Sequence, residues 1–153
     1  MEQTLVILKP SAIDRGLCGT IIARLEQKGL KIAGMKMMQL DEPILREHYA
    51  HLVDRPFFPS LVLSMSRTPV IVMCLEGRDA VSVVRAMTGA TNCRQAAPGT
   101  IRGDLGMSGQ ENIIHASDSV ENGKIEVARF FYPNEIFDYS TVTTKAIYAT
   151  DEL

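Results

Sequence analysis

The chain has 153 residues, of which 46% are hydrophobic and 22% charged, and its formal net charge is −2. This length predicts one domain over residues 1–153 with its own core, and the apolar content excludes a disordered chain. The longest purely apolar run, Val70–Leu75, is too short for a membrane span, and the small negative charge does not suggest a nucleic-acid-binding protein.

The first two predicted elements are a strand and a helix. Thr4–Leu8 is a short β-rich run that ends before Pro10. Apolar residues at helical spacing between Cys18 and Lys28 predict a helix, with Gly29 as its C-cap.

A second strand is predicted over residues 30–40, where apolar and polar residues partly alternate. One face would carry Leu30, Ile32, Met38 and Leu40. The other face also holds apolar residues, Ala33, Met35 and Met37, which is expected if a partner chain covers part of it.

Helices and a strand alternate through the middle of the chain. Asp41 is a predicted N-cap for a helix whose apolar residues keep helical spacing as far as Leu52. Pro56 and Pro59 bracket the start of another short predicted helix, which continues to Met65. The continuous apolar run after Pro69 predicts a strand buried on both faces. Asp79 would cap the next helix, which ends at residue 89.

Residues 89–111 contain five glycines and little periodicity, which predicts a functional or assembly loop. A short strand over 112–115 follows, then a helix to about Phe131 that Asp118 and Glu121 would open as a capping box. The order of elements predicts an α+β, ferredoxin-like fold: a four-stranded antiparallel sheet with helices on one face.

His115 is the sharpest chemical feature, because it ends a strand just before a helix N-terminus. A neutral imidazole is a good nucleophile near pH 7, and helix N-termini favour anions. His48 and His51 are interpreted as ordinary packed or exposed histidines. No histidine or carboxylate motif points to a metal held by the protein.

Basic residues beside strand ends and loops suggest phosphate binding. They are Lys9, Arg55, Arg85 and Arg102. Neither a Walker loop nor a Rossmann glycine turn is present, so side chains would have to bind the phosphates. Phe57 could stack on a base, although core packing is the simpler interpretation.

Together these segments resemble the nucleoside diphosphate kinase family, from about Thr4 to Tyr148. The matching segments are Ile7-Leu-Lys9-Pro10, Glu47-His-Tyr49, Asp54-Arg-Pro-Phe-Phe58, Pro98-Gly-Thr-Ile-Arg102-Gly-Asp104 and Asn112-Ile-Ile-His115-Ala-Ser117-Asp118-Ser119, followed by Glu126. The chain departs from the family pattern at Ser11, Cys93, Ala116 and residues 108–111.

The resemblance implies transfer of the γ-phosphate of a nucleoside triphosphate, typically ATP, to a nucleoside diphosphate, with Mg²⁺ carried by the nucleotide phosphates. His115 would form a pros-phosphohistidine, Glu126 and Ser117 would orient its ring, and Tyr49 would help position the phosphoryl group. Lys9, Arg85, Thr91 and Arg102 would bind phosphates, Asn112 a sugar hydroxyl and Phe57 the base.

Two other functions remain open on the sequence alone: a catalytically weak nucleotide-binding relative, and a ferredoxin-like ligand-binding regulatory module. The family also implies a homo-oligomer, and the tail through Phe137 and Tyr148 favours a hexamer over a tetramer. Three cysteines without paired spacing and no leader-like N-terminus indicate a cytoplasmic protein without disulfides or structural zinc.

Overall fold

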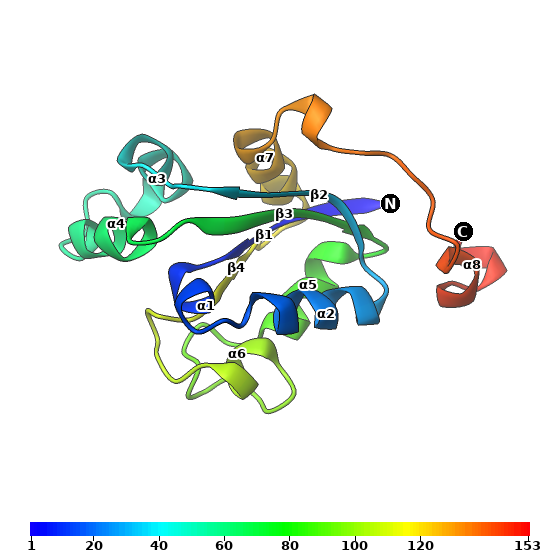
Figure 1. Cartoon of the computed structure of the whole chain (residues 1–153), viewed down its shortest axis with the longest axis horizontal. Coiled ribbons are helices and arrows are strands. Elements are labelled where there is room, and N and C mark those ends of the chain that lie inside the picture. The colour runs from blue at the N-terminus through cyan, green and yellow to red at the C-terminus, as the bar shows by residue number, and fades with distance from the viewer.

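The computed structural model describes residues 1–153 as a four-stranded sheet between helices (Figure 1). The strands are β1 (Glu2–Leu8), β2 (Lys31–Met38), β3 (Val70–Gly77) and β4 (Ile114–Ala116). Their spatial order is β2-β3-β1-β4, and each neighbouring pair is antiparallel. Order and pairing confirm the predicted ferredoxin-like sheet.

Helices cover both faces of the sheet, so the prediction that they lie on one face is wrong. One face carries α2 (Cys18–Lys28) and α5 (Ala80–Thr88), and the other carries α7 (Val120–Phe130), with α3 (Glu42–His48) and α4 (Phe58–Ser66) toward one end (Figure 1). The cause is that β1 is buried on both sides from Thr4 to Leu8: Val6 packs toward α2 and α5, and Ile7 packs toward α7.

Several shorter helices lie in the connections. They are α1 (Pro10–Asp14), α6 (Ile101–Leu105), α8 (Thr144–Ile147) and 3₁₀ turns at Ala50–Leu52, Pro133–Glu135 and Thr150–Glu152. The sequence did not predict α1 or α6, and the helix expected to run to Leu52 is α3 followed by the first of these 3₁₀ turns. None of the helices has the length and apolar character needed to cross a lipid bilayer.

β2 does not keep its apolar residues on one face as predicted. The pairing with β3 is irregular between Ile32 and Gly34, which leaves Ala33 without a register partner. Such a bulge exchanges the faces of the residues that follow it. Leu30 therefore packs on the α2 side, whereas Leu40 packs on the α7 side.

Two predicted caps are confirmed and two are not. The Asp41 carboxylate accepts from a backbone N–H in the first turn of α3, and Gly29 ends α2 with φ 106°. Asp79 occupies the N-cap position of α5, but its side chain makes no capping bond. At α7 the cap is Ser119 and not Asp118, because Ser119 directly precedes the first turn and its Oγ accepts from the N–H three residues on.

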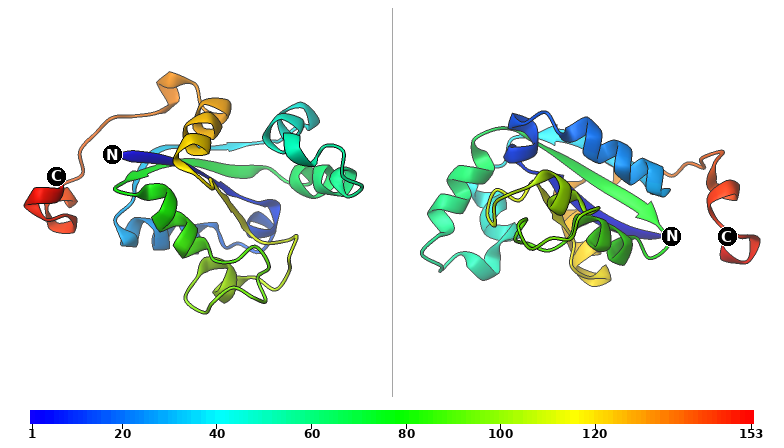
Figure 2. Two further views of the ribbon diagram at one scale, coloured as in Figure 1. Left: turned by 180° about the vertical axis from the view of Figure 1, so that it is seen from behind. Right: turned by 90° about the horizontal axis from the view of Figure 1, so that it is seen from below.

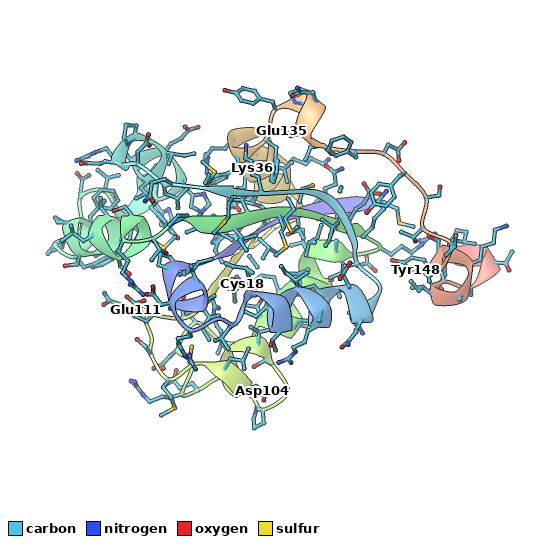
Figure 3. All side chains as sticks on the ribbon, in the orientation of Figure 1. Cys18, Lys36, Asp104, Glu111, Glu135 and Tyr148 are labelled. Atoms are coloured by element: carbon cyan, nitrogen blue, oxygen red, sulfur yellow. The ribbon has the colours of Figure 1, made fainter.

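The C-terminal segment leaves the sheet after α7 and returns along its end, where both chain termini lie (Figures 1 and 2). Ile147 packs on Gly29, where the absence of a Cβ leaves room for it. The Tyr148 hydroxyl accepts a hydrogen bond of 3.1 Å from the backbone N–H of Arg78 (Figure 3). The last helix is thus fixed to the ends of α2 and β3.

Candidate active site

One cleft gathers nine of the ten residues that the sequence analysis assigns to catalysis or nucleotide binding. Two adjoining depressions of about 370 and 650 Å³ form it, and they share Lys9, Tyr49, Leu52, Thr91 and Asn112. Phe57 lines the smaller depression; Arg85, Arg102, His115 and Glu126 line the larger one. Only Ser117 lies behind the wall, fully buried.

His115 is held by a short chain of hydrogen bonds that runs into the sheet. Its Nε2 lies 2.8 Å from a carboxylate oxygen of Glu126 on α7. The Ser117 hydroxyl donates to the same oxygen at 2.9 Å and accepts from the backbone N–H of Leu5 at 3.0 Å. Glu126 lies about two turns into α7, on the face that turns back toward β4.

This arrangement selects one reactive nitrogen on the ring. A carboxylate only accepts hydrogen bonds, so Nε2 of His115 carries the proton when the imidazole is neutral. Nδ1 then holds the lone pair, and it has no hydrogen-bond partner within the chain. The ring therefore offers Nδ1 as its nucleophilic atom.

Arg102 is tied into the wall of the cleft. The residue is 4% exposed, and its guanidinium donates to the backbone carbonyls of Gly89, Asn112 and Ile114 at 3.1, 3.2 and 2.7 Å. These bonds join the start of the 89–111 segment to β4. Five N–H groups are available on a guanidinium, so two remain for an anion in the cleft.

Lys9 and Asn112 form the floor between the two depressions. Lys9 Nζ donates to Asn112 Oδ1 at 2.6 Å, and the Asn112 amide donates to the Thr91 carbonyl at 3.1 Å. Burial, together with the neighbouring Arg102, lowers the pKa of Lys9 to about 8. A cation held at such a cost favours an incoming anion.

The remaining predicted residues are more loosely held. Phe57 precedes α4 and is 41% exposed, so it is available for stacking and is not a core residue. Arg85 makes one long contact, 3.5 Å to the Ala116 carbonyl. Burial raises the pKa of Tyr49, which keeps its hydroxyl protonated beside the cleft. Arg55, in contrast, lines neither depression.

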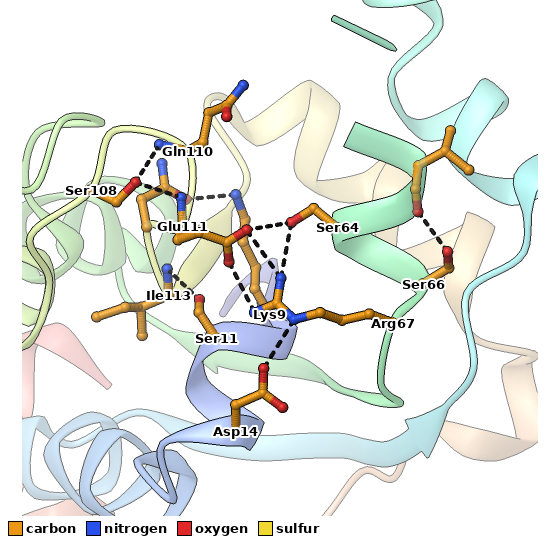
Figure 4. A network of polar contacts seen from close by, with 12 residues as sticks. Lys9, Ser11, Asp14, Ser64, Ser66, Arg67, Ser108, Gln110, Glu111 and Ile113 are labelled. Carbon is orange, nitrogen blue, oxygen red and sulfur yellow. Dashed lines mark hydrogen bonds and ion pairs between the residues drawn. The ribbon is translucent and has the colours of Figure 1, made fainter. Parts of the chain in front are cut away.

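A strained backbone position lies two residues before His115. Ile113 is fully buried and has φ 75°, a region that β-branched residues rarely adopt. Its N–H donates to the Ser11 hydroxyl at 3.2 Å, and its carbonyl accepts from the N–H of Lys9 at 2.8 Å (Figure 4). Ser11, a departure from the family pattern, thus stabilises the turn that presents His115.

A second network next to the cleft was not predicted. The Arg67 guanidinium binds both carboxylate oxygens of Glu111 at 3.0 Å and reaches Asp14 at 2.9 Å (Figure 4). Ser64 donates to the same Glu111 carboxylate at 2.7 Å. These bonds connect α1, α4 and the segment before β4 beside the smaller depression, which Ser64 lines.

His48 is a close neighbour of His115 that the sequence does not predict. It was interpreted as an ordinary packed histidine, yet its ring centroid lies 4.5 Å from that of His115. The two residues are 67 positions apart in the chain. Two sequence signals bear on it: the helical spacing with Leu45, which predicts that this side chain faces inward, and its place in the matching segment Glu47-His-Tyr49.

Comparison with known proteins places the chain in one family. The sequence model described as nucleoside diphosphate kinase matches residues 2–136. The nucleoside diphosphate kinase of Parabacteroides distasonis is 59% identical over 152 residues, which cover 99% of each chain. That of Pyrococcus horikoshii is 53% identical over 141 residues, 90% of each chain.

Solved structures of the same family share the fold. The nucleoside diphosphate kinase of Halobacterium salinarum in complex with CDP has a TM-score of 0.93 and 44% identity, covering 96% of this chain and 98% of its own. The apo enzyme of Encephalitozoon cuniculi has a TM-score of 0.92 and 41% identity, covering 97% and 100%. With the cleft and His115 arranged as described, the chain belongs to the nucleoside diphosphate kinase family.

Proposed function

We propose that this protein transfers the γ-phosphoryl group of a nucleoside triphosphate, typically ATP, to a nucleoside diphosphate through a phosphohistidine at His115. This reaction would maintain the pools of ribo- and deoxyribonucleoside triphosphates. The observation that carries the proposal is the imidazole itself: Nε2 is bound to Glu126, and Nδ1 is left free in a cleft lined by Lys9, Arg85 and Arg102.

The chemistry requires no proton transfer to or from His115. The Nδ1 lone pair forms the N–P bond while the bond from phosphorus to the bridging oxygen breaks, and the diphosphate leaves with that electron pair. The phosphorylated ring gains positive charge, and the Glu126 carboxylate at Nε2 stabilises it. An incoming diphosphate reverses the same step, which regenerates His115.

The nucleotide would lie along the cleft with its base at Phe57 and its phosphates toward His115. Lys9, Arg85, Thr91 and the free N–H groups of Arg102 would bind the phosphates. Asn112 would bind a sugar hydroxyl, and Tyr49 would help to position the phosphoryl group. Since Phe57 offers only a ring face, this arrangement predicts broad tolerance for the base.

Mg²⁺ fits this cleft as part of the nucleotide and not as a metal held by side chains. Besides Glu126, the cleft carboxylates are Glu47 and Asp118, which are already bound by Arg129 and Asn122. Mg²⁺ binds oxygen ligands and commonly takes them from substrate phosphates and water. When bound, it would reduce the negative charge on the phosphates.

A phosphoryl-exchange assay tests the proposed function. The protein is incubated with Mg²⁺, ATP and a diphosphate of a different base, and formation of the second triphosphate is followed. Turnover with several acceptor bases is expected. Binding without turnover would indicate the catalytically weak relative, and no nucleotide binding would indicate a regulatory module for another ligand.

Nucleotide binding at pH 8 is expected to draw about half a proton from solution per site, because Lys9 is then half neutral in the free protein and phosphate restores its charge. Affinity therefore falls as the pH rises above about 8. Calorimetry in buffers of different ionisation enthalpy measures this uptake. Lys9→Met is the control and should show none; equal uptake by both proteins would assign the proton to another group.

Phe57→Ala is expected to weaken nucleotide binding by about 1–3 kcal/mol, because the base loses its stacking partner. The loss should be similar for adenine, guanine, cytosine and uracil nucleotides. Titration calorimetry with the four diphosphates measures it. A loss confined to one base would reveal a contact to the base edge and contradict the stacking assignment.

We also propose a cytoplasmic homo-oligomer in which each chain is one domain, and a hexamer in preference to a tetramer. Met35 and Met37 on the edge strand β2 are 52% and 60% exposed, and Phe137 in the tail is 62% exposed, which supports contacts between chains. Light scattering should give six times the mass of one chain; four or two times that mass would contradict the hexamer.

A further inference from the structure

His48, at the C-terminal end of α3, is enclosed by aromatic rings. Its ring centroid lies 4.7 Å from Tyr49, 4.5 Å from His115 and 5.1 Å from Phe130, and all three pairs are edge-to-face. The residue is only 8% exposed. His48 therefore forms the inner wall against which the His115 imidazole rests.

Hydrogen bonding fixes the protonation of His48. Arg129 Nη1 lies 3.0 Å from its Nδ1, and a guanidinium can only donate, so Nδ1 accepts and Nε2 carries the proton. Burial, together with the nearby His115 and Arg129, lowers the pKa of His48 to about 2. The ring is thus a neutral body in fixed orientation, anchored from α7 through Arg129.

The Nε2–H of His48 is buried and has no partner. An unpaired buried donor is costly, and such costs concentrate at functional positions. Here the cost occurs at a side chain that touches the predicted nucleophile. The single hydrogen bond that His48 accepts from Arg129 does not account for an unpaired imidazole at this buried position.

A metal site is the other chemistry that this cluster suggests, because ligand atoms of His48, His115 and Glu126 all lie within 4.8 Å of one another. Metal binding needs a lone pair on each imidazole. In His48 the Nδ1 lone pair is bound by Arg129, and Nε2 carries a proton. The adjacent guanidinium would also repel a cation. The geometry favours a packing role over a metal ligand.

We propose that His48 is a positioning residue: its ring packs edge-to-face on His115 and, with Glu126, holds the imidazole so that Nδ1 and not Nε2 meets the phosphoryl group. This inference rests on the proposed function. Glu126 restrains one edge of the imidazole, and His48 prevents the ring from tilting or turning over. Without that wall, either nitrogen of His115 could face the nucleotide.

Two variants separate the ring of His48 from its hydrogen bond. His48→Phe keeps an aromatic ring but cannot accept from Arg129, whereas His48→Gln keeps an acceptor but removes the ring. His51→Gln is the matched control, since His51 lies three residues further along the chain, is exposed, and carries no assigned role. Thermal unfolding verifies that each variant is folded.

The decisive measurement is the phosphohistidine isomer, read by ³¹P NMR after denaturation in alkali, where both isomers survive. The wild type, His48→Phe and His51→Gln should give the pros isomer alone, and His48→Gln a mixture with the tele isomer. For His48→Gln, kcat should fall about 100-fold while KM stays within about twofold. His48→Phe should stay within about threefold of the wild-type kcat.

The outcomes distinguish this inference from the proposed function. A wild type that forms no phosphohistidine would overturn the proposed function. If the wild type forms the pros isomer and His48→Gln also forms only that isomer at the wild-type rate, the positioning role is overturned and the proposed function is not. A loss in His48→Phe with His48→Gln at the wild-type rate would assign the effect to the Arg129 hydrogen bond and also overturn the role of the ring.

Discussion

The variant His115→Ala is expected to take up no phosphate from a labelled triphosphate and to lose at least about 10⁴-fold in exchange activity. Neither of the other two histidines that line the cleft is placed as His115 is, since His48 is buried with its Nδ1 bound by Arg129 and His51 is exposed with no hydrogen bond to orient its ring. Nucleotide binding should largely survive, because Lys9, Arg102 and Phe57 remain. Wild-type protein incubated with labelled ATP and Mg²⁺, without acceptor, should carry one acid-labile, alkali-stable label that any nucleoside diphosphate removes.

Glu126→Ala is the graded control for this experiment. It leaves the Nδ1 lone pair in place but removes the acceptor at Nε2, so labelling should slow by about 100-fold and still reach completion. In His115→Gly, added imidazole could restore slow transfer to the free ring. The nucleophile assignment fails if His115→Ala turns over at a rate comparable with wild type, or if the label maps to Ser117 or Ser119.

Arg102→Met is expected to lower the free energy of unfolding by about 3–5 kcal/mol, in addition to weakening nucleotide binding. Three backbone carbonyls lose a charged donor in a buried place, and no other side chain replaces it. For a chain of this length the melting temperature should fall by about 10 °C. Arg102→Lys should recover only part of this loss, because an ammonium group lacks the planar fork.

Arg85→Met is the matched control, because Arg85 faces the same cleft but is exposed and makes a single contact of 3.5 Å. Its melting temperature should change by no more than about 2 °C. Both unfolding curves are measured without nucleotide or phosphate, so that ligand binding does not mask the difference. Equal destabilisation by the two variants would show that the three carbonyl bonds of Arg102 contribute little.

The strands β1, β2 and β3 and the longer helices could be predicted because each has seven or more residues over which an apolar pattern can be read. The α2 helix was predicted with its bounds, Cys18–Lys28, and its cap at Gly29. α1 is not predicted, because it has only five residues and begins at a proline, which on its own indicates the end of a strand. α6 also has only five residues, and it lies within the glycine-rich segment, where no helical periodicity can be read.

The faces of β2 and of the sheet could not be predicted because both depend on partners outside the local sequence. The bulge at Ala33 is defined by pairing with β3, which is distant in the chain. The apolar run of β3 does predict burial on both faces, but it does not show whether a helix or a partner chain covers the second face, so the helices there were not predicted.

The candidate site was predictable as a set of residue types but not as a structure. Resemblance to the family identified His115 and Glu126, and the two side chains do meet at 2.8 Å. The sequence does not predict the specific contacts: that of His48 with His115, that of Ser11 with Ile113, or the three bonds of Arg102. Each depends on how distant segments pack together.

The strand that carries His115 is also the one with the smallest attachment to the sheet. β4 forms three register pairs with β1, whereas β3 forms seven with the same strand, and β4 lies at an edge. Hydrogen exchange at β4 should therefore report local opening at a lower free energy than in β1 or β3. A nucleotide bound between Phe57 and His115, as proposed above, would bind only the closed form and would raise that opening free energy. Substrate would thereby contribute to the order of the strand that carries the proposed nucleophile.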